Sequence, residues 1–191
     1  MPNQQLSRIL LKEFREVGRQ MFADGLISSF DGNMSIRRGE RIVITRRSAM
    51  LHGLEETDLI EMPMDAAAHP PGSNEFIVHN AIYRTTTALA IIYAHPPTAL
   101  ALSLSPGSHE IVSWEPESAL LARNVPILDV EKVLGPKEFA NVICRALSGH
   151  SIAVAREHGS FAIGETLEEA YERTASLEHT SRIIMAGLWR G

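Results

Sequence analysis

The sequence predicts a single α/β domain of three α-β-α layers, in which a mainly antiparallel central sheet is covered by helices on both faces. Its 191 residues suit one domain over residues 1–191. Segments of strand and helix character are mixed along the chain, and some of the links are short enough for hairpins. The run LAIIYA at 89–94 is almost continuously apolar, which is typical of a central strand buried on both faces.

Composition argues against several classes of partner and location. The net charge of −5 disfavours sequence-independent nucleic-acid binding, because such binding needs clustered Lys and Arg. No run of about 20 apolar residues exists, so we expect no membrane span. The N-terminal segment lacks the basic start and apolar block of a signal peptide. The single cysteine, Cys144, cannot form an internal disulfide and should be a small buried residue; together these features favour the cytoplasm.

Hydrophobic spacing predicts where the individual elements lie. Apolar residues recur at helical spacing from Leu6 to Met21, so the chain should open with a helix. Thr166 should cap the last helix of the chain. The segment 69–74 has the composition of a loop. Strands are expected at 41–45, 58–62, 89–94, 125–130 and 151–155, and further helices at 75–84, 98–104 and 136–147.

Two of the eight histidines stand out from the others. His95 and His158 each follow directly on a predicted buried strand, and functional sites gather at strand ends in layered α/β proteins. Neutral imidazole is the commonest metal ligand, so both are candidate ligands, although their spacing alone does not establish a metal site. The remaining histidines in polar or loop-like contexts should be solvated surface residues: His52, His69, His109, His150 and His179.

Glu75 follows a Pro-Pro-Gly-Ser-Asn loop and should open a helix. One interpretation is a first-turn glutamate that satisfies free backbone N–H groups and the helix dipole, and the residue by itself favours this role. The other is a carboxylate held near a metal ion, where it moves a proton. His79 lies four residues later on the same helix face. It either supports Glu75 or is a half-buried histidine, and we expect the latter.

Two short polar segments are candidates for binding a phosphate or a carboxylate. Glycine exposes backbone N–H groups, and the side chains of Ser, Thr and Asn add short hydrogen-bond donors. Two ordinary turns would have the same composition, so the residues alone leave the choice open. The residues concerned are Gly32, Asn33 and Ser35 in the first segment, and Thr45, Arg47 and Ser48 in the second.

The chain resembles the class II aldolase/adducin family from about Phe14 to Leu188. Six short motifs of this family occur in the chain in the order in which the family has them. Each motif is weak alone, but their order over a chain of this length is specific. Two departures from the family pattern matter most: Tyr93 stands for the first histidine of His-x-His-Pro, and the pair Arg47-Ser48 stands for Ser-Gly. The motifs are Gly-Asn-x-Ser at 32–35, Ile-Thr with the altered pair at 44–48, Ser-Asn-Glu at 73–75, Tyr-Ala-His-Pro at 93–96, His-Gly at 158–159 and Thr-Leu-Glu-Glu-Ala at 166–170.

The resemblance implies a metal-dependent aldolase that cleaves or forms a carbon–carbon bond in a short, L-fuculose-1-phosphate-like sugar phosphate through an enediolate. It implies that His95, His158 and Glu75 hold a divalent ion, with Zn²⁺ the first candidate, and that Glu75 is also the proton-moving base. The substrate phosphate would bind Gly32-Asn33, Arg47-Ser48 and Ser73-Asn74. The family also implies a homotetramer with active sites at subunit contacts.

Other members of the family carry out epimerase, decarboxylase or dehydratase chemistry, and the same motifs suit these reactions. A degenerate, non-catalytic module similar to the adducin head is a further alternative. Retention of His95, His158 and Glu75 together favours an enzyme over such a module.

The two departures carry expectations of their own. Side chains alternate along a strand, so Tyr93 should face the same side of the sheet as His95 and line the same pocket. Tyr93 is then a phenolate ligand, a neutral hydroxyl that touches substrate, or a plug in an inactive site. We favour the neutral hydroxyl, because it needs no large pKa shift and would supply a catalytic acid. Arg47 should give a charged, bidentate grip on a phosphate, or on a carboxylate-bearing substrate.

Overall fold

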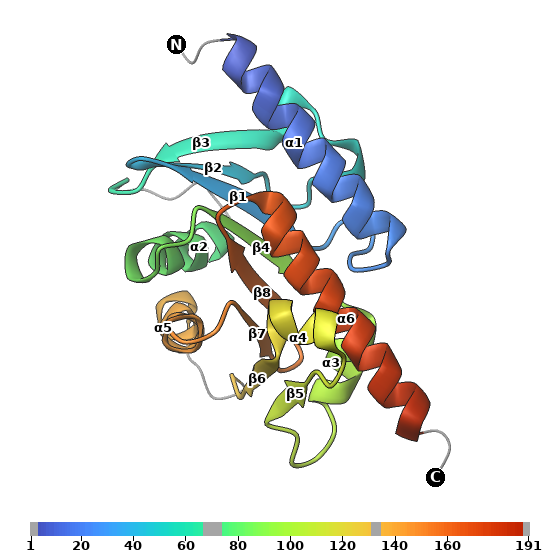
Figure 1. Cartoon of the computed structure of the whole chain (residues 1–191). Coiled ribbons are helices and arrows are strands. Elements are labelled where there is room, and N and C mark those ends of the chain that lie inside the picture. The colour runs from blue at the N-terminus through green and yellow to red at the C-terminus, as the bar shows by residue number, and fades with distance from the viewer. Residues whose placement is uncertain (1–3, 67–73, 131–134, 189–191) are drawn as a thin grey trace.

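An eight-stranded sheet runs through the middle of the protein, in the order β3-β2-β1-β4-β8-β7-β6-β5 (Figure 1). The computed structural model describes residues 4–66, 74–130 and 135–188. The strands are β1 (Asn33–Arg38), β2 (Arg41–Thr45), β3 (Leu59–Pro63), β4 (Ala90–Ala94), β5 (Glu110–Val112), β6 (Asn124–Leu128), β7 (Ile152–Ala155) and β8 (Gly159–Gly164).

Neighbouring strands are antiparallel throughout this sheet except for β6 and β7, which pair in parallel. A parallel pair needs a crossover connection, and helix α5 (Pro136–Leu147) lies in the chain between these two strands. The expected mainly antiparallel sheet is therefore confirmed, with one parallel pair that makes it a mixed sheet.

Helices cover both faces of the sheet, which gives the three predicted layers (Figure 1). Helices α2 (Asn74–Thr85) and α5 pack on one face. Two short 3-10 helices, η1 (Leu51–Gly53) and η2 (Glu56–Asp58), lie between β2 and β3. The other face carries α1 (Gln4–Ala23), α3 (Pro97–Ser103), α4 (Pro116–Ala122) and α6 (Leu167–Leu188).

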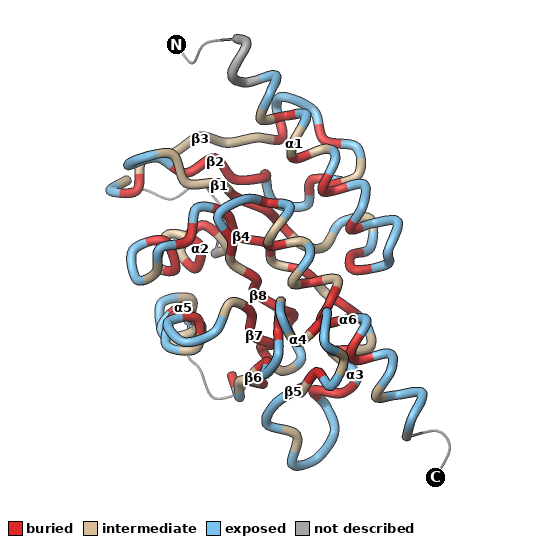
Figure 2. The backbone as a smooth tube through the Cα atoms, in the orientation of Figure 1, coloured by how far each residue is buried: buried red, intermediate tan, exposed pale blue. Residues whose placement is uncertain are grey.

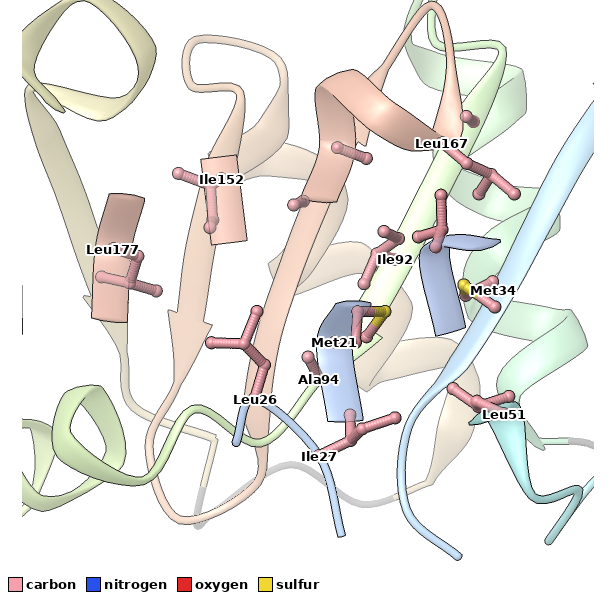
Figure 3. Packing of buried hydrophobic residues seen from close by; sticks show 14 of the residues in the cluster. Met21, Leu26, Ile27, Met34, Leu51, Ile92, Ala94, Ile152, Leu167 and Leu177 are labelled. Atoms are coloured by element: carbon pink, nitrogen blue, oxygen red, sulfur yellow. The ribbon is translucent and has the colours of Figure 1, made fainter. Parts of the chain in front are cut away.

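The side chains of the central strands divide between two hydrophobic cores, as the two-residue repeat of a strand requires. In β4, Ile92 packs with Met21 of α1 and Met34 of β1 (Figure 3). Its neighbour Ile91 points the opposite way and packs with Phe76 of α2. Figure 2 shows the consequence, because the tube of the central strands is buried over most of its length.

Most of the elements expected from the sequence are confirmed. The structure contains every predicted strand and helix, with small shifts of the ends, and Thr166 caps α6 by accepting a 3.1 Å hydrogen bond from the backbone N–H of Glu169. Cys144 is buried within α5, as expected. Residues 69–73 of the predicted loop lie outside the described residues.

The sequence did not predict β1, β5, α4 or β8. Strand β1 begins inside the polar segment that follows α1, and its polar residues Asn33 and Ser35 are buried on one face of the sheet. Strand β5 has three residues, which is too short for a periodic pattern. Within residues 4–66, 74–130 and 135–188, no helix is both long and apolar enough to cross a membrane.

A buried carboxylate on α6 holds the start of α3, the helix that follows His95. Glu178 is 1% exposed. It accepts hydrogen bonds from the Thr98 hydroxyl at 2.7 Å and from the backbone N–H groups of Thr98 and Ala99 at 3.0 and 3.1 Å. Arg182, one turn later on α6, donates to the same carboxylate at 3.0 Å. Glu178 therefore ties the segment after β4 to the long C-terminal helix.

We expect Glu178→Ala to lower the free energy of unfolding by about 2–4 kcal/mol, because it leaves buried donors at the start of α3 without an acceptor. Chemical denaturation measures the loss. Glu172→Ala is the control, since Glu172 is exposed on the same helix and its removal should change the value by less than about 0.5 kcal/mol. Equal effects of the two variants would contradict the structural role of Glu178.

Candidate active site

The hydroxyl of Tyr93 joins two segments that are far apart in the chain. It lies 2.8 Å from Nε2 of His95, two residues along the chain, and 2.8 Å from the carbonyl oxygen of His158, which precedes β8. The phenol ring stacks on Phe161 of β8, with ring centroids 4.6 Å apart. Tyr93 therefore stands between the two candidate histidines.

A partly buried carboxylate orients the imidazole of His95. Oδ2 of Asp31 lies 3.1 Å from Nδ1 of His95, and Oδ1 accepts hydrogen bonds from the backbone and the hydroxyl of Ser28, both at 2.6 Å. Burial raises the pKa of Asp31, but the hydrogen bonds from Ser28 and His95 outweigh it and lower this pKa below the ordinary value. The ionised Asp31 accepts a hydrogen bond from Nδ1–H of His95 and so orients the ring, with Nε2 facing the hydroxyl oxygen of Tyr93, whose proton goes to the carbonyl oxygen of His158.

Asp31 was not among the residues singled out in the sequence. It directly precedes the Gly-Asn pair at 32–33, so the one available signal was a carboxylate beside a candidate anion-binding loop.

The imidazole of His158 is exposed and has a defined orientation. Its Nδ1 lies 2.9 Å from the carbonyl oxygen of Arg156, which is an acceptor, so Nδ1 carries the proton and Nε2 carries the lone pair. The ring lies beside Phe139 of α5, with centroids 5.4 Å apart. Both candidate histidines therefore have an Nδ1 anchored by an oxygen. Nε2 of His158 carries a lone pair, and Nε2 of His95 contacts the hydroxyl of Tyr93.

Glu75 is in the first turn of α2 and is partly buried. Among the described residues its Oε2 atom is buried without a hydrogen-bond partner. Burial, with the negative charges of Glu75 and Asp31, raises the pKa of Tyr93 to about 12. Tyr93 is consequently a neutral phenol at physiological pH, with a proton to donate.

Two cavities meet at Glu75 and Tyr93, which line both. The polar cavity has a volume of about 280 Å³ and the aromatic cavity about 320 Å³. The polar cavity is lined by Phe30, Asp31, Gly32, Asn33, Ile44, Thr45, Arg47, Ser48, Glu75, Tyr93 and His95. The aromatic cavity is lined by Glu75, Val78, Tyr93, Val130, Gly135, Pro136, Phe139, His158 and Phe161.

The polar cavity brings together most of the residues singled out in the sequence. His158 lines the aromatic cavity instead, on the other side of Tyr93. Ser73 and the side chain of Asn74 lie outside the described residues.

Of the other histidines, His109, His150 and His179 are exposed as expected, whereas His52 is half-buried and its ring stacks on that of Phe22, with centroids 4.2 Å apart. The expectation of a half-buried His79 is wrong, because its imidazole lies between helix α2 and the sheet, where it contacts Ser35 of β1, and is 0% exposed.

Comparison with known proteins identifies the family. The family description "Class II Aldolase and Adducin N-terminal domain" matches residues 12–185. The chain belongs to the class II aldolase/adducin family. The crystal structure of L-fuculose-1-phosphate aldolase from Thermus thermophilus superposes with a TM-score of 0.88 and 34% identity, over 95% of this chain and 96% of that one.

Two curated proteins that are similar in sequence are named for a dehydratase reaction and not for an aldolase reaction. The methylthioribulose-1-phosphate dehydratase of Acidiphilium cryptum is 31% identical over 87% of this chain and 85% of its own length. A probable bifunctional methylthioribose-1-phosphate isomerase/methylthioribulose-1-phosphate dehydratase of Nocardia farcinica is 25% identical over 87% of this chain. The chain spans only 34% of that bifunctional protein.

The donor atoms fit a divalent cation in chemical type, as expected of this class II aldolase family member. Two imidazoles offer Nε2 atoms, and Glu75 offers a carboxylate that lines both cavities. The described part of the chain nevertheless holds no group of three or more His, Cys, Asp or Glu side chains placed to share one ion. In the described arrangement Nε2 of His95 contacts the hydroxyl of Tyr93, so that hydroxyl would have to move before His95 could bind an ion.

Two glycines of the family motifs shape the site. Gly32 has φ +80°, and a Cβ atom there would lie 2.9 Å from the carbonyl oxygen of Tyr93. Gly159 has φ +152°, and its Cβ would lie 2.5 Å from the carbonyl oxygen of Ala94 and 2.7 Å from ring carbons of both Tyr93 and His95. Only glycine gives these two rings their positions.

We expect Gly159→Ala to displace the rings of Tyr93 and His95 and to lower the free energy of unfolding by about 1–3 kcal/mol, because the added methyl group meets backbone and ring atoms. A crystal structure and denaturation curves measure the two effects. Gly149→Ala is the matched control, since a Cβ atom at Gly149 would have nothing within 4 Å among the described residues. Unmoved rings in Gly159→Ala would contradict the described packing.

Proposed function

We propose that this protein is a class II aldolase-type lyase that forms or cleaves a carbon–carbon bond in a short sugar phosphate similar to L-fuculose 1-phosphate. The observation that carries the proposal is the polar cavity, because anion-binding groups and proton-moving groups line the same space of about 280 Å³. A cavity of that size suits a small metabolite. The 34% identity to an L-fuculose-1-phosphate aldolase supports the same conclusion.

The phosphate would bind where the start of β1 meets the end of β2. Gly32 and Asn33 lie at the start of β1, and Arg47 and Ser48 follow β2. Ser48 has φ +57°, an unusual conformation for a residue other than glycine. The family has glycine at this position, so the turn is retained while the residue type has changed. The guanidinium of Arg47 would add a charged, bidentate hydrogen-bonding group for phosphate.

Two side chains would move protons on opposite sides of the bond that forms. In the synthetic direction Glu75 takes a proton from the carbon beside the carbonyl group, which leaves an enediolate. That carbon attacks the carbonyl carbon of an aldehyde, and Tyr93 donates its phenolic proton to the new alkoxide. The raised pKa of Tyr93 keeps this proton in place until the alkoxide forms. Cleavage is the reverse sequence.

We propose that His95, His158 and Glu75 hold a divalent ion, with Zn²⁺ the first candidate for a site of nitrogen and carboxylate ligands. When bound, such an ion supplies Lewis-acid stabilisation of negative charge on the substrate oxygens. The chain itself would orient the two imidazoles, because each Nδ1 is held by an oxygen acceptor.

A dehydratase is the second candidate, because the 31% identity to a methylthioribulose-1-phosphate dehydratase covers most of both chains. Dehydration would use the carboxylate of Glu75 to remove a proton and the phenol of Tyr93 to assist the departing hydroxyl.

Following the family resemblance, we further propose a cytoplasmic homotetramer with active sites at subunit contacts. Analytical ultracentrifugation at micromolar concentration tests the assembly, and a monomer would contradict it.

A panel of short ketose 1-phosphates, assayed with added Zn²⁺, Mn²⁺ or Co²⁺, tests the reaction. We expect release of an aldehyde together with a triose phosphate, because the cavity provides groups for a phosphate and for proton transfer. Loss of water without carbon–carbon cleavage would assign the dehydratase reaction instead. The absence of turnover with every substrate and metal would favour the non-catalytic module.

We expect Tyr93→Phe to lower turnover by about 100-fold or more, the usual scale for a lost acid–base group, while the metal content stays unchanged. The substitution removes the hydroxyl and retains the ring that stacks on Phe161. Steady-state kinetics and metal analysis of the same preparation measure both quantities. Loss of metal would indicate that Tyr93 is a metal ligand. Unchanged turnover and metal content would indicate that Tyr93 only lines the cavities.

We expect Tyr93→His to raise the affinity for Zn²⁺ about tenfold or more, because it replaces a neutral phenol with an imidazole beside His95, and a change in the ligand environment has effects of this scale. Competition with a chromophoric chelator gives the affinity. Tyr171→His, outside the site, is the control. Equal affinities of Tyr93→His and the native protein would show that no ligand geometry is available at position 93.

A further inference from the structure

Three buried polar side chains form a hydrogen-bonded cluster between β1 and α2, the helix whose first turn contains Glu75. The hydroxyl of Ser35 lies 2.7 Å from Nδ1 of His79 and 2.8 Å from the hydroxyl of Tyr83. All three residues are 0% exposed. The proposed reaction does not use them, yet buried polar groups of this kind are costly unless they are paired. We refer to Ser35, His79 and Tyr83 as the buried triad.

The donor direction in the buried triad follows from its protonation states. Burial lowers the pKa of His79 to about 3, so its imidazole is neutral and carries one N–H. Burial also raises the pKa of Tyr83 above its ordinary value, so this phenol keeps its proton. Within the described residues, the acceptor for the Tyr83 proton is the oxygen of Ser35. The Ser35 proton then goes to Nδ1 of His79, and the imidazole proton is left on Nε2.

That Nε2–H group has a complementary acceptor one helical turn away. Nε2 of His79 and Oε2 of Glu75 are both buried and lack a hydrogen-bond partner among the described residues. The two residues are four apart on α2, where side chains are neighbours on one face. One atom is a donor and the other an acceptor, so pairing them, directly or through one water molecule, satisfies both.

We propose that His79 is a positioning residue for Glu75: its Nε2–H group holds Oε2 of the carboxylate, so that the other oxygen faces the cavities. The hydrogen bonds then run in one direction from Tyr83 through Ser35 and His79 to Glu75. This inference rests on the proposed function, because it assigns His79 to the residue that moves the proton. A base held at one oxygen presents the other in a single orientation, which is what proton transfer from carbon requires.

Nuclear magnetic resonance of protein labelled with ¹⁵N in histidine tests the geometry without any substrate. We expect His79 to show a protonated Nε2 and an unprotonated Nδ1 at about pH 7, because the fully buried ring favours its neutral form and Nδ1 accepts from Ser35. Its resonances are assigned by their loss in His79→Gln. In Glu75→Gln the Nε2 proton resonance should move, because an amide replaces the carboxylate that it contacts. In the control Glu172→Gln, an exposed position on α6, it should not move.

Either of two results overturns the proposal: an imidazole protonated on Nδ1, or an Nε2 proton resonance that is the same in Glu75→Gln and the native protein. The second result would assign the donor to another acceptor, such as the buried amide oxygen of Asn33, which also lacks a partner among the described residues.

Kinetics of two variants test the consequence for the reaction. We expect His79→Phe to lower kcat about 10- to 100-fold at unchanged KM, and His79→Gln, whose side chain retains a donor, to recover part of the loss. Thermal unfolding shows whether each variant is folded, and the resonance of Glu75→Gln does not depend on that outcome. If no substrate is turned over but the resonance moves in Glu75→Gln, the proposed function fails and the geometry stands. If turnover occurs and the resonance is unmoved, the inference fails alone.

Discussion

Strand β4 is covered on both faces, and the alternation of its side chains decides the layout of the site. Ile92 and Ala94 must enter the core beneath α1 and α6, so Ile91, Tyr93 and His95 face the opposite side. Tyr93 and His95 cannot separate without a shift of register that would expose the apolar residues of the strand. The contact between the phenol and the imidazole is therefore a consequence of how the sheet is buried.

The positions of Tyr93 and His95 also constrain two neighbouring segments, the start of β8 and the start of α3. The rings of Tyr93 and His95 lie against Gly159, so the start of β8 has no room for a Cβ atom at this position. On the far side of His95 the chain enters α3, whose first turn is held by the buried carboxylate of Glu178. The site is thus supported by the C-terminal helix on one side and by a close backbone approach on the other.

Charge is unevenly distributed around Tyr93. Asp31 and Glu75 both act to keep the phenol protonated, while Arg47 lies in the same polar cavity toward the proposed phosphate position. An acid and a base can work side by side only if their proton affinities differ, and the raised pKa of Tyr93 suits its proposed role as the acid. The buried triad adds to this arrangement, because His79 would offer Glu75 a buried hydrogen-bond donor.

The sequence by itself determined the family, the layers of the fold and most residues of the polar cavity, because hydrophobic periodicity and the short motifs at 32–35, 93–96 and 158–159 are local properties of the chain. It also determined that Tyr93 and His95 share a face. It did not reveal β5 or α4, whose residues carry little periodic pattern.

Only the tertiary structure decided which polar residues are partners. Asp31 became part of the site because the loop before β1 folds against the end of β4. Ser35, whose motif suggested a ligand-binding loop, instead bonds to His79, which the helix places over the sheet. Hydrogen bonds between residues 44 and 64 positions apart depend on strand order and helix packing, and neither is a property of a short window of sequence.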